Sequence, residues 1–168
     1  MGTCKITTSP GAKHPSLGER HSWLLNNGAG LELKTLKGVE LRFDPSMEWE
    51  LIRDERPDLG PYRVTTRAYR YSLSGPGGIE YVSLHWHPEG NSLVRDPHIH
   101  LGAALLSDSS PVTPKAHLPT PRHTFEMAVR WVVEFGVKPA CDDWREKLDL
   151  AETPHLLYRS WAERMPDA

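Results

Sequence analysis

The sequence predicts an α+β fold: a curved antiparallel β-sheet of about five to six strands, followed by two to three C-terminal helices packed on one face. Short segments of alternating apolar and polar residues, separated by turns rich in Gly and Pro, fill residues 29–106. Apolar residues at helical spacing replace this pattern within residues 122–164. Strands that precede helices, rather than alternate with them, favour an α+β domain.

Length and composition are those of one ordinary domain. The chain has 168 residues and a formal net charge of −2, so it has no overall attraction to nucleic acid. We expect a flexible polar N-terminal arm at residues 1–20 and a single domain at residues 21–168. Two cysteines and the lack of a long apolar run predict a cytoplasmic protein without membrane association.

The first strands are predicted by two-residue alternation. Residues 31–34 and 39–43 alternate on either side of a turn at residues 37–38, which indicates a hairpin. Asp44-Pro45 is expected to close this hairpin. A third strand is expected at residues 49–52.

Three further strands are predicted between residues 62 and 106. Residues 62–73 are rich in β-branched and aromatic side chains, which indicates a long strand. A glycine-rich turn at 74–78 leads to a strand at 79–87. After a loop that ends at Pro97, the last strand is expected from His98 to about Leu106.

The helices are predicted from caps and periodicity. Thr124 is suited to cap a first helix that Gly136 ends. A second helix is expected over residues 142–150. Thr153-Pro154 resembles the start of a third helix, which would end near Arg164.

Histidine is the unusual residue of this chain. Four of its nine histidines form two His-x-His pairs, His85 with His87 and His98 with His100. Residues two apart on a strand point to the same face, and the intervening positions are apolar. If the two strands pair as a hairpin, the four imidazoles become cross-strand neighbours on the face opposite the core.

Two chemistries fit such a cluster. Neutral imidazoles bind Zn, Fe, Ni or Cu, and Glu89 or Asp96 could add a carboxylate ligand. Alternatively, imidazoles that titrate near neutral pH act as general acid and base without a cofactor, as in metal-independent RNA cleavage.

Cleavage of a phosphodiester also needs groups that bind phosphate. Arg63 and Arg67 are expected to share one strand face with Tyr69. Arg95 lies in the loop between the two His-x-His pairs, and His117 is a secondary candidate beyond them. The substrate-binding candidates are Arg63, Arg67, Tyr69, Arg95, Arg122 and His123.

Residues 62–136 resemble the TumE-type toxins of bacterial toxin–antitoxin systems. The matching motifs are Tyr69-Arg70-Tyr71, His85-Trp86-His87-Pro88, Pro97-His98-Ile99-His100-Leu101-Gly102 and Thr124-Phe125-Glu126. The resemblance implies a small cytoplasmic toxin that acts on RNA and is neutralised by an antitoxin protein. The paired His-x-His motifs are also similar to cupin metal sites.

Three functions therefore stay open. The first is a toxin-like, metal-independent endoribonuclease that uses His85, His87, His98 and His100 for acid–base catalysis. The second is a metal-binding enzyme or protein of cupin-like character, in which the same residues hold a divalent transition metal. The third is a non-enzymatic interaction module, since an exposed edge strand supports homodimerisation or pairing with a partner.

Overall fold

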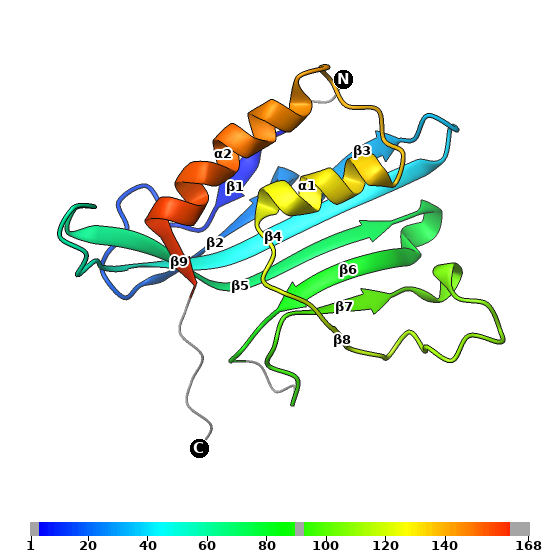
Figure 1. The fold of residues 1–168 in the computed structure, drawn as a ribbon, viewed down its shortest axis with the longest axis horizontal. Coiled ribbons are helices and arrows are strands. Elements are labelled where there is room, and N and C mark those ends of the chain that lie inside the picture. Colours follow the sequence, from blue (N-terminus) through cyan, green and yellow to red (C-terminus); the bar gives the residue numbers. More distant parts are fainter. Residues whose placement is uncertain (1–3, 90–92, 162–168) are drawn as a thin grey trace.

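The computed structural model describes residues 4–89 and 93–161. It confirms the α+β class: one open, mainly antiparallel sheet carries two helices on one face (Figure 1). The strands are β1 (Ile6–Thr8), β2 (Arg20–Leu25), β3 (Leu31–Lys34), β4 (Glu40–Arg53), β5 (Tyr62–Ser74), β6 (Glu80–Trp86), β7 (His98–Leu101), β8 (Leu118–Pro119) and β9 (Arg159–Trp161), and the helices are α1 (Phe125–Glu134) and α2 (Trp144–Tyr158).

The sheet has more strands than the five to six predicted. Its nine described strands run in the order β1-β2-β4-β5-β6-β7-β8, with β3 also beside β4 and β9 beside β5. β1 lies within the expected N-terminal arm and pairs antiparallel with β2, whereas β9 runs parallel to β5. β1, β8 and β9 have only two or three residues each, so their alternation is too brief to distinguish them from loops. β2 has six residues and was also missed.

β4 is longer than predicted because it runs through Pro45. Closure of the hairpin at residues 44–45 was therefore a wrong prediction, and the expected strand at 49–52 belongs to the same element. Pairing with β3 ends at Phe43, and pairing with β2 begins at Ser46. Proline, which lacks an N–H, is tolerated in this gap between two partner strands.

The β6–β7 hairpin is confirmed, but β7 ends at Leu101 rather than near Leu106. Directly after the strand, two backbones approach each other closely. A Cβ atom added to Gly102 would lie 1.6 Å from the carbonyl oxygen of Glu80. The chain then leaves the sheet in a 3-10 turn at Ala103–Leu105.

The first helix forms as predicted. The other two merge into α2, and the predicted helical end near Arg164 was wrong, because α2 ends at Tyr158 and the strand β9 follows. The hydroxyl of Thr124 accepts a hydrogen bond from the N–H of Met127 at 3.1 Å, and Gly136 follows the helix with a φ of 92°. α2 continues through Pro154, so the predicted break there was wrong. Pro154 is exposed in the last turns of the helix, where the loss of one hydrogen bond is tolerated.

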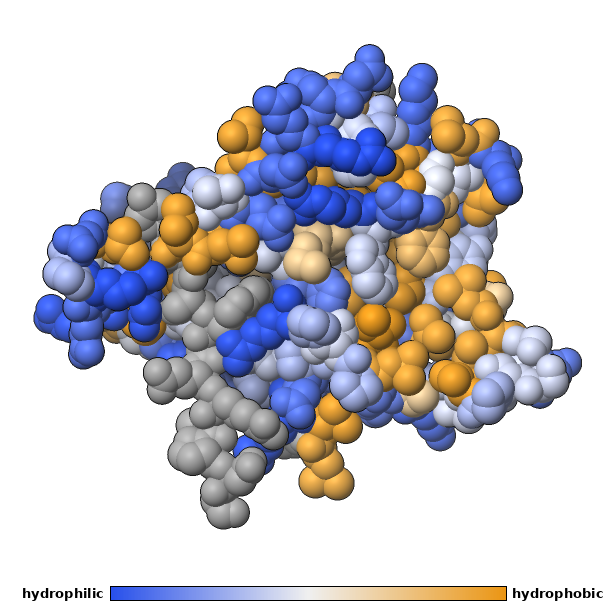
Figure 2. All heavy atoms as spheres, viewed as in Figure 1, coloured by the Kyte–Doolittle hydropathy of each residue, from blue (hydrophilic) through white to orange (hydrophobic). Residues whose placement is uncertain are grey.

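The core lies between α1 and the sheet. Its buried side chains alternate along the strands, and the central ones are Leu41, Phe43, Met47, Tyr69, Tyr71, Leu73, Val82, Leu84, Trp86, Ala128 and Val132. Figure 2 shows mainly hydrophilic side chains over α2 and hydrophobic ones gathered beside α1. Neither described helix is both long and apolar enough to cross a lipid bilayer. Because Val82, Leu84 and Trp86 face the core, the histidines of β6 and β7 face the other way.

Candidate metal centre

The predicted convergence of the four histidines is confirmed. His85 and His98 lie directly opposite each other in the β6–β7 ladder. Their ring centroids are 5.7 Å apart, and those of His85 and His100 are 5.1 Å apart. His87 lies 5.4 Å from His98 by the same measure.

Three of these rings are close enough to share one ion. Ring nitrogens of His85, His98 and His100 all lie within 4.8 Å of one another. Metal–imidazole bonds are about 2.0–2.1 Å long, so the three nitrogens would have to draw closer together around a shared ion. The three side chains come from two adjacent strands, which fixes their backbones relative to one another.

His98 has the strongest features of a ligand. Its side chain is only 1% exposed, and its Nδ1 lies 2.8 Å from the carbonyl oxygen of Asp96. A carbonyl only accepts, so Nδ1 carries the proton and Nε2 presents a lone pair. Among the described residues, that buried Nε2 has no hydrogen-bond partner. A carbonyl that orients one nitrogen and leaves the other open is the usual arrangement behind a metal-binding histidine.

The surroundings keep the other two rings neutral. Burial, followed by the neighbouring His100 and His98, lowers the pKa of His85 to about 3. Burial also lowers the pKa of His100, although a hydrogen bond to the Pro114 carbonyl opposes the shift. The pKa of His98 is lowered by burial as well. Neutral imidazole is the form that binds metals.

A fifth imidazole joins from the loop after β7. The ring centroid of His117 lies 4.4 Å from that of His100 and 4.7 Å from that of His98. His117 was only a secondary candidate in the sequence, because its place depends on the path of the loop and on the pairing of β8 with β7. We call His85, His87, His98, His100 and His117 the histidine cluster.

Glu89 and Asp96, which the sequence offered as extra carboxylate ligands, make other contacts in the structure. Glu89 accepts a hydrogen bond from Arg20 at 2.6 Å. Asp96 contributes its backbone carbonyl, which orients His98. The candidate ligand set is therefore made of imidazoles.

Three predicted substrate-binding residues lie on the helix-covered side of the sheet. Tyr69 is buried in the core, and its hydroxyl accepts a hydrogen bond from the backbone N–H of His123 at 3.0 Å. The guanidinium of Arg122 lies 4.4 Å from the ring centroid of Trp86, which is also a core residue. The sheet separates Tyr69, Arg122 and His123 from the histidine cluster.

Arg67 does not share a face with Tyr69 as predicted. The β4–β5 register shifts between Glu48 and Trp49, which leaves Arg67 as the extra residue of a β-bulge. The bulge reverses the expected direction of the side chain, and Nε of Arg67 donates to Glu50 at 2.6 Å.

Three other arginines, Arg63, Arg95 and Arg70, lie in different places relative to the histidine cluster. Arg63 lies 3.8 Å from Asp54, and Arg95 is exposed in the loop between β6 and β7. Arg70, by contrast, pairs directly with His85 across β5 and β6. A surface hollow beside the cluster is lined in part by Glu48, Arg70, His85 and His87.

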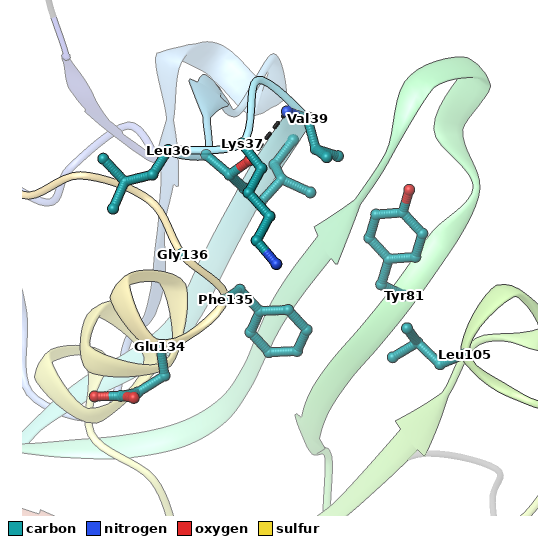
Figure 3. Close-up of a pocket in the computed structure, with 10 residues that line it drawn as sticks. Leu36, Lys37, Val39, Tyr81, Leu105, Glu134, Phe135 and Gly136 are labelled. Atoms are coloured by element: carbon teal, nitrogen blue, oxygen red, sulfur yellow. Dashed lines mark hydrogen bonds between the residues drawn. The ribbon is translucent and has the colours of Figure 1, made fainter.

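A second hollow, away from the histidines, is mainly apolar. Figure 3 shows it between the end of α1, the turn before β4 and the strand β6. Phe135, Tyr81 and Leu105 line it together with Val39, whose N–H donates to the Thr35 hydroxyl at 3.0 Å. Its lining contains no histidine, so it has no part in the chemistry of the cluster.

Comparisons with known proteins give no relative. No family model matches the chain, and neither a curated protein nor a solved structure is significantly similar to it. The resemblance to TumE-type toxins therefore stays a prediction, and the functional argument depends on the site itself.

Proposed function

We propose that this protein binds one divalent transition-metal ion through His85, His98 and His100. The observation that carries the proposal is His98, whose buried Nε2 has no partner among the described residues and whose ring has a nitrogen within 4.8 Å of ring nitrogens of His85 and His100. A buried acceptor without a hydrogen bond is costly, and a metal ion supplies the missing interaction.

The ligand chemistry favours particular ions. A set of imidazoles suits Zn, Ni, Cu or Fe, whereas Mg and Ca prefer oxygen ligands. Three protein ligands leave at least one coordination position for water, which a bound metal converts to a nucleophile near neutral pH. We therefore infer a metal-dependent hydrolytic enzyme, with His87 or His117 beside the metal as proton acceptor.

We also infer a cytoplasmic location. Cys4 and Cys141 are both free thiols, which is the expected state of cysteines in a reducing compartment.

The proposal is tested by equilibrium dialysis of untagged protein against Zn²⁺ and Co²⁺. We expect one ion per chain, a loss of at least about 100-fold in affinity for His98→Ala, and no change for His14→Ala, which removes an exposed histidine outside the cluster. Less than half an ion per wild-type chain, or equal affinity in His98→Ala, would contradict a metal centre.

A metal-independent endoribonuclease is the second candidate. It is favoured by Arg70, a half-exposed cation directly opposite His85 on the histidine face. It ranks second because acid–base catalysis needs one protonated imidazole, and the pKa values of His85, His98 and His100 are all lowered.

This second candidate would act on RNA and would have an antitoxin protein as its partner. RNA cleavage that survives excess chelator and is lost in His98→Ala would favour it over the metal enzyme. Cleavage that chelator abolishes would exclude the metal-free mechanism.

A further inference from the structure

We propose that the metal centre takes an oxyanion, either a free anion or the anionic group of a larger substrate, held between the metal ion and Arg70. This inference depends on the metal centre proposed above and adds the chemical class of its ligand.

Arg70 lies in one row with two proposed ligands. Arg70 pairs with His85 across β5 and β6, and His85 pairs with His98 across β6 and β7. Paired residues on adjacent strands project from the same face, and neighbouring strands are about 4.8 Å apart. The guanidinium is therefore on the histidine face, at one flank of the ligand set, within reach of a ligand bound to the metal.

The guanidinium of Arg70 is also weakly engaged. Its nitrogens lie 3.8 Å from Asp44 and 3.9 Å from Glu80, too far for hydrogen bonds. Within the described residues no hydrogen bond holds the Arg70 side chain, which is 50% exposed. Arg20 and Arg67 differ, because each donates to a glutamate at 2.6 Å. The N–H donors of the Arg70 guanidinium are thus not used in hydrogen bonds among the described residues, and they are available to a ligand.

The charge of the centre selects an anion. Three neutral imidazoles leave the full charge of a divalent ion uncompensated, and Arg70 adds a planar pair of donors suited to phosphate or carboxylate. Glu48, the carboxylate that lines the adjoining hollow, lies 3.6 Å from Arg20, which offsets its charge. Asp44 and Glu80, at 3.8 and 3.9 Å from Arg70, offset part of the positive charge of Arg70 but leave that of the metal ion. An oxyanion fits between the two positive groups.

The hollow beside the cluster gives such a ligand a route. Arg70, His85 and His87 line one part of it, and Ser22 and Ser46 line another. A ligand in this hollow meets Arg70 and the metal from the solvent side.

The test uses the full-length protein loaded with Co²⁺, whose visible absorption spectrum changes when its ligands change. Cobalt stoichiometry is measured first, so failure of the metal centre is detected before any anion is added. Phosphate and acetate are then titrated separately into wild type, Arg70→Gln and Arg42→Gln. Arg42 is a matched control, since it is an arginine of β4 whose side chain is bonded to the Gly28 carbonyl.

We expect a saturable spectral change with at least one of the two anions, about tenfold weaker in Arg70→Gln and unaltered in Arg42→Gln. The anion that binds more tightly, phosphate or acetate, shows whether the site prefers a phosphate or a carboxylate group. Either preference supports the proposal. Stoichiometric cobalt with no response to either anion would overturn the proposal and leave the metal centre standing. Equal anion affinity in wild type and Arg70→Gln would also overturn the proposal and leave the metal centre standing.

Discussion

At the residue scale, His98 is the side chain on which the account depends. One of its ring nitrogens is bonded to the Asp96 carbonyl, while the other is buried without a partner among the described residues. An unsatisfied buried polar group costs about 1–3 kcal/mol. The proposed metal ion would remove this cost by bonding to the free nitrogen.

This cost leads to a prediction for His98→Leu. Because leucine replaces a buried polar ring with an apolar group, we expect the free energy of unfolding of the metal-free protein to stay within about 1 kcal/mol of wild type. The same variant should lose the rise in melting temperature that Zn²⁺ gives the wild type. Thermal unfolding with and without Zn²⁺ measures both. Full zinc stabilisation of His98→Leu would show that His98 is not a ligand.

Tyr69 gives a separate prediction at high pH, remote from the metal. Burial raises the pKa of Tyr69 to about 12. The unfolded chain loses this proton near pH 10, so the stabilisation present below pH 10 is lost as the pH rises from 10 through 12. Tyr69→Phe should therefore show a smaller loss of unfolding free energy over that range than wild type. Denaturant titrations at several pH values measure the slopes, and parallel slopes would contradict the burial of this phenol.

At the element scale, a close backbone contact directly follows the strand that carries two of the proposed ligands. Gly102 packs its Cα against the backbone of Glu80, directly after the strand that carries His98 and His100. The backbone there has no room for a side chain, and the loop toward His117 begins directly after it.

Gly102→Ala tests this contact. A Cβ atom there would lie 1.6 Å from the Glu80 carbonyl oxygen, so the strands must separate. We expect a loss of more than about 3 kcal/mol in the free energy of unfolding, at the upper end of overpacking costs. Ala103→Ser, at the exposed next position, is the control and should change it by less than about 0.5 kcal/mol. Chemical denaturation measures both, and similar values for the two variants would contradict the close approach.

The directions of some strand side chains could be predicted from the sequence, and those of others could not. The side-chain direction of His85 and His98 depends on a two-residue period within short strands, so the convergence of the histidines was predictable. The direction of Arg67 was not, because a single bulge in β5 reverses it. The passage of β4 through Pro45 also depends on which strands flank it, and a local pattern does not contain that information.

At the scale of the whole molecule, the sheet separates two environments. Its helix-covered face holds the core with Tyr69, while the other face holds the histidine cluster. His117 and the short strands lay beyond sequence prediction for the same reason: their places are set by contacts between segments far apart in the chain. The fold class was predictable because it needs only the order of strand-like and helix-like segments.

This organisation would make the proposed metal binding a property of the folded chain. The proposed ligands come from β6 and β7, and His117 comes from the loop before α1, so the unfolded chain has no comparable site. A metal ion should therefore stabilise the fold by mass action, by about 2.7 kcal/mol when free metal is 100 times its dissociation constant.

The most direct test of the metal centre is X-ray absorption spectroscopy of the untagged protein loaded with one equivalent of Zn²⁺. We expect a first shell of nitrogen and oxygen atoms at about 2.0–2.1 Å, with the outer-shell scattering of three imidazoles in wild type and a weaker imidazole signal in His98→Ala. A shell made of oxygen or sulfur atoms, or an imidazole signal that His98→Ala leaves unchanged, would contradict the proposed metal centre.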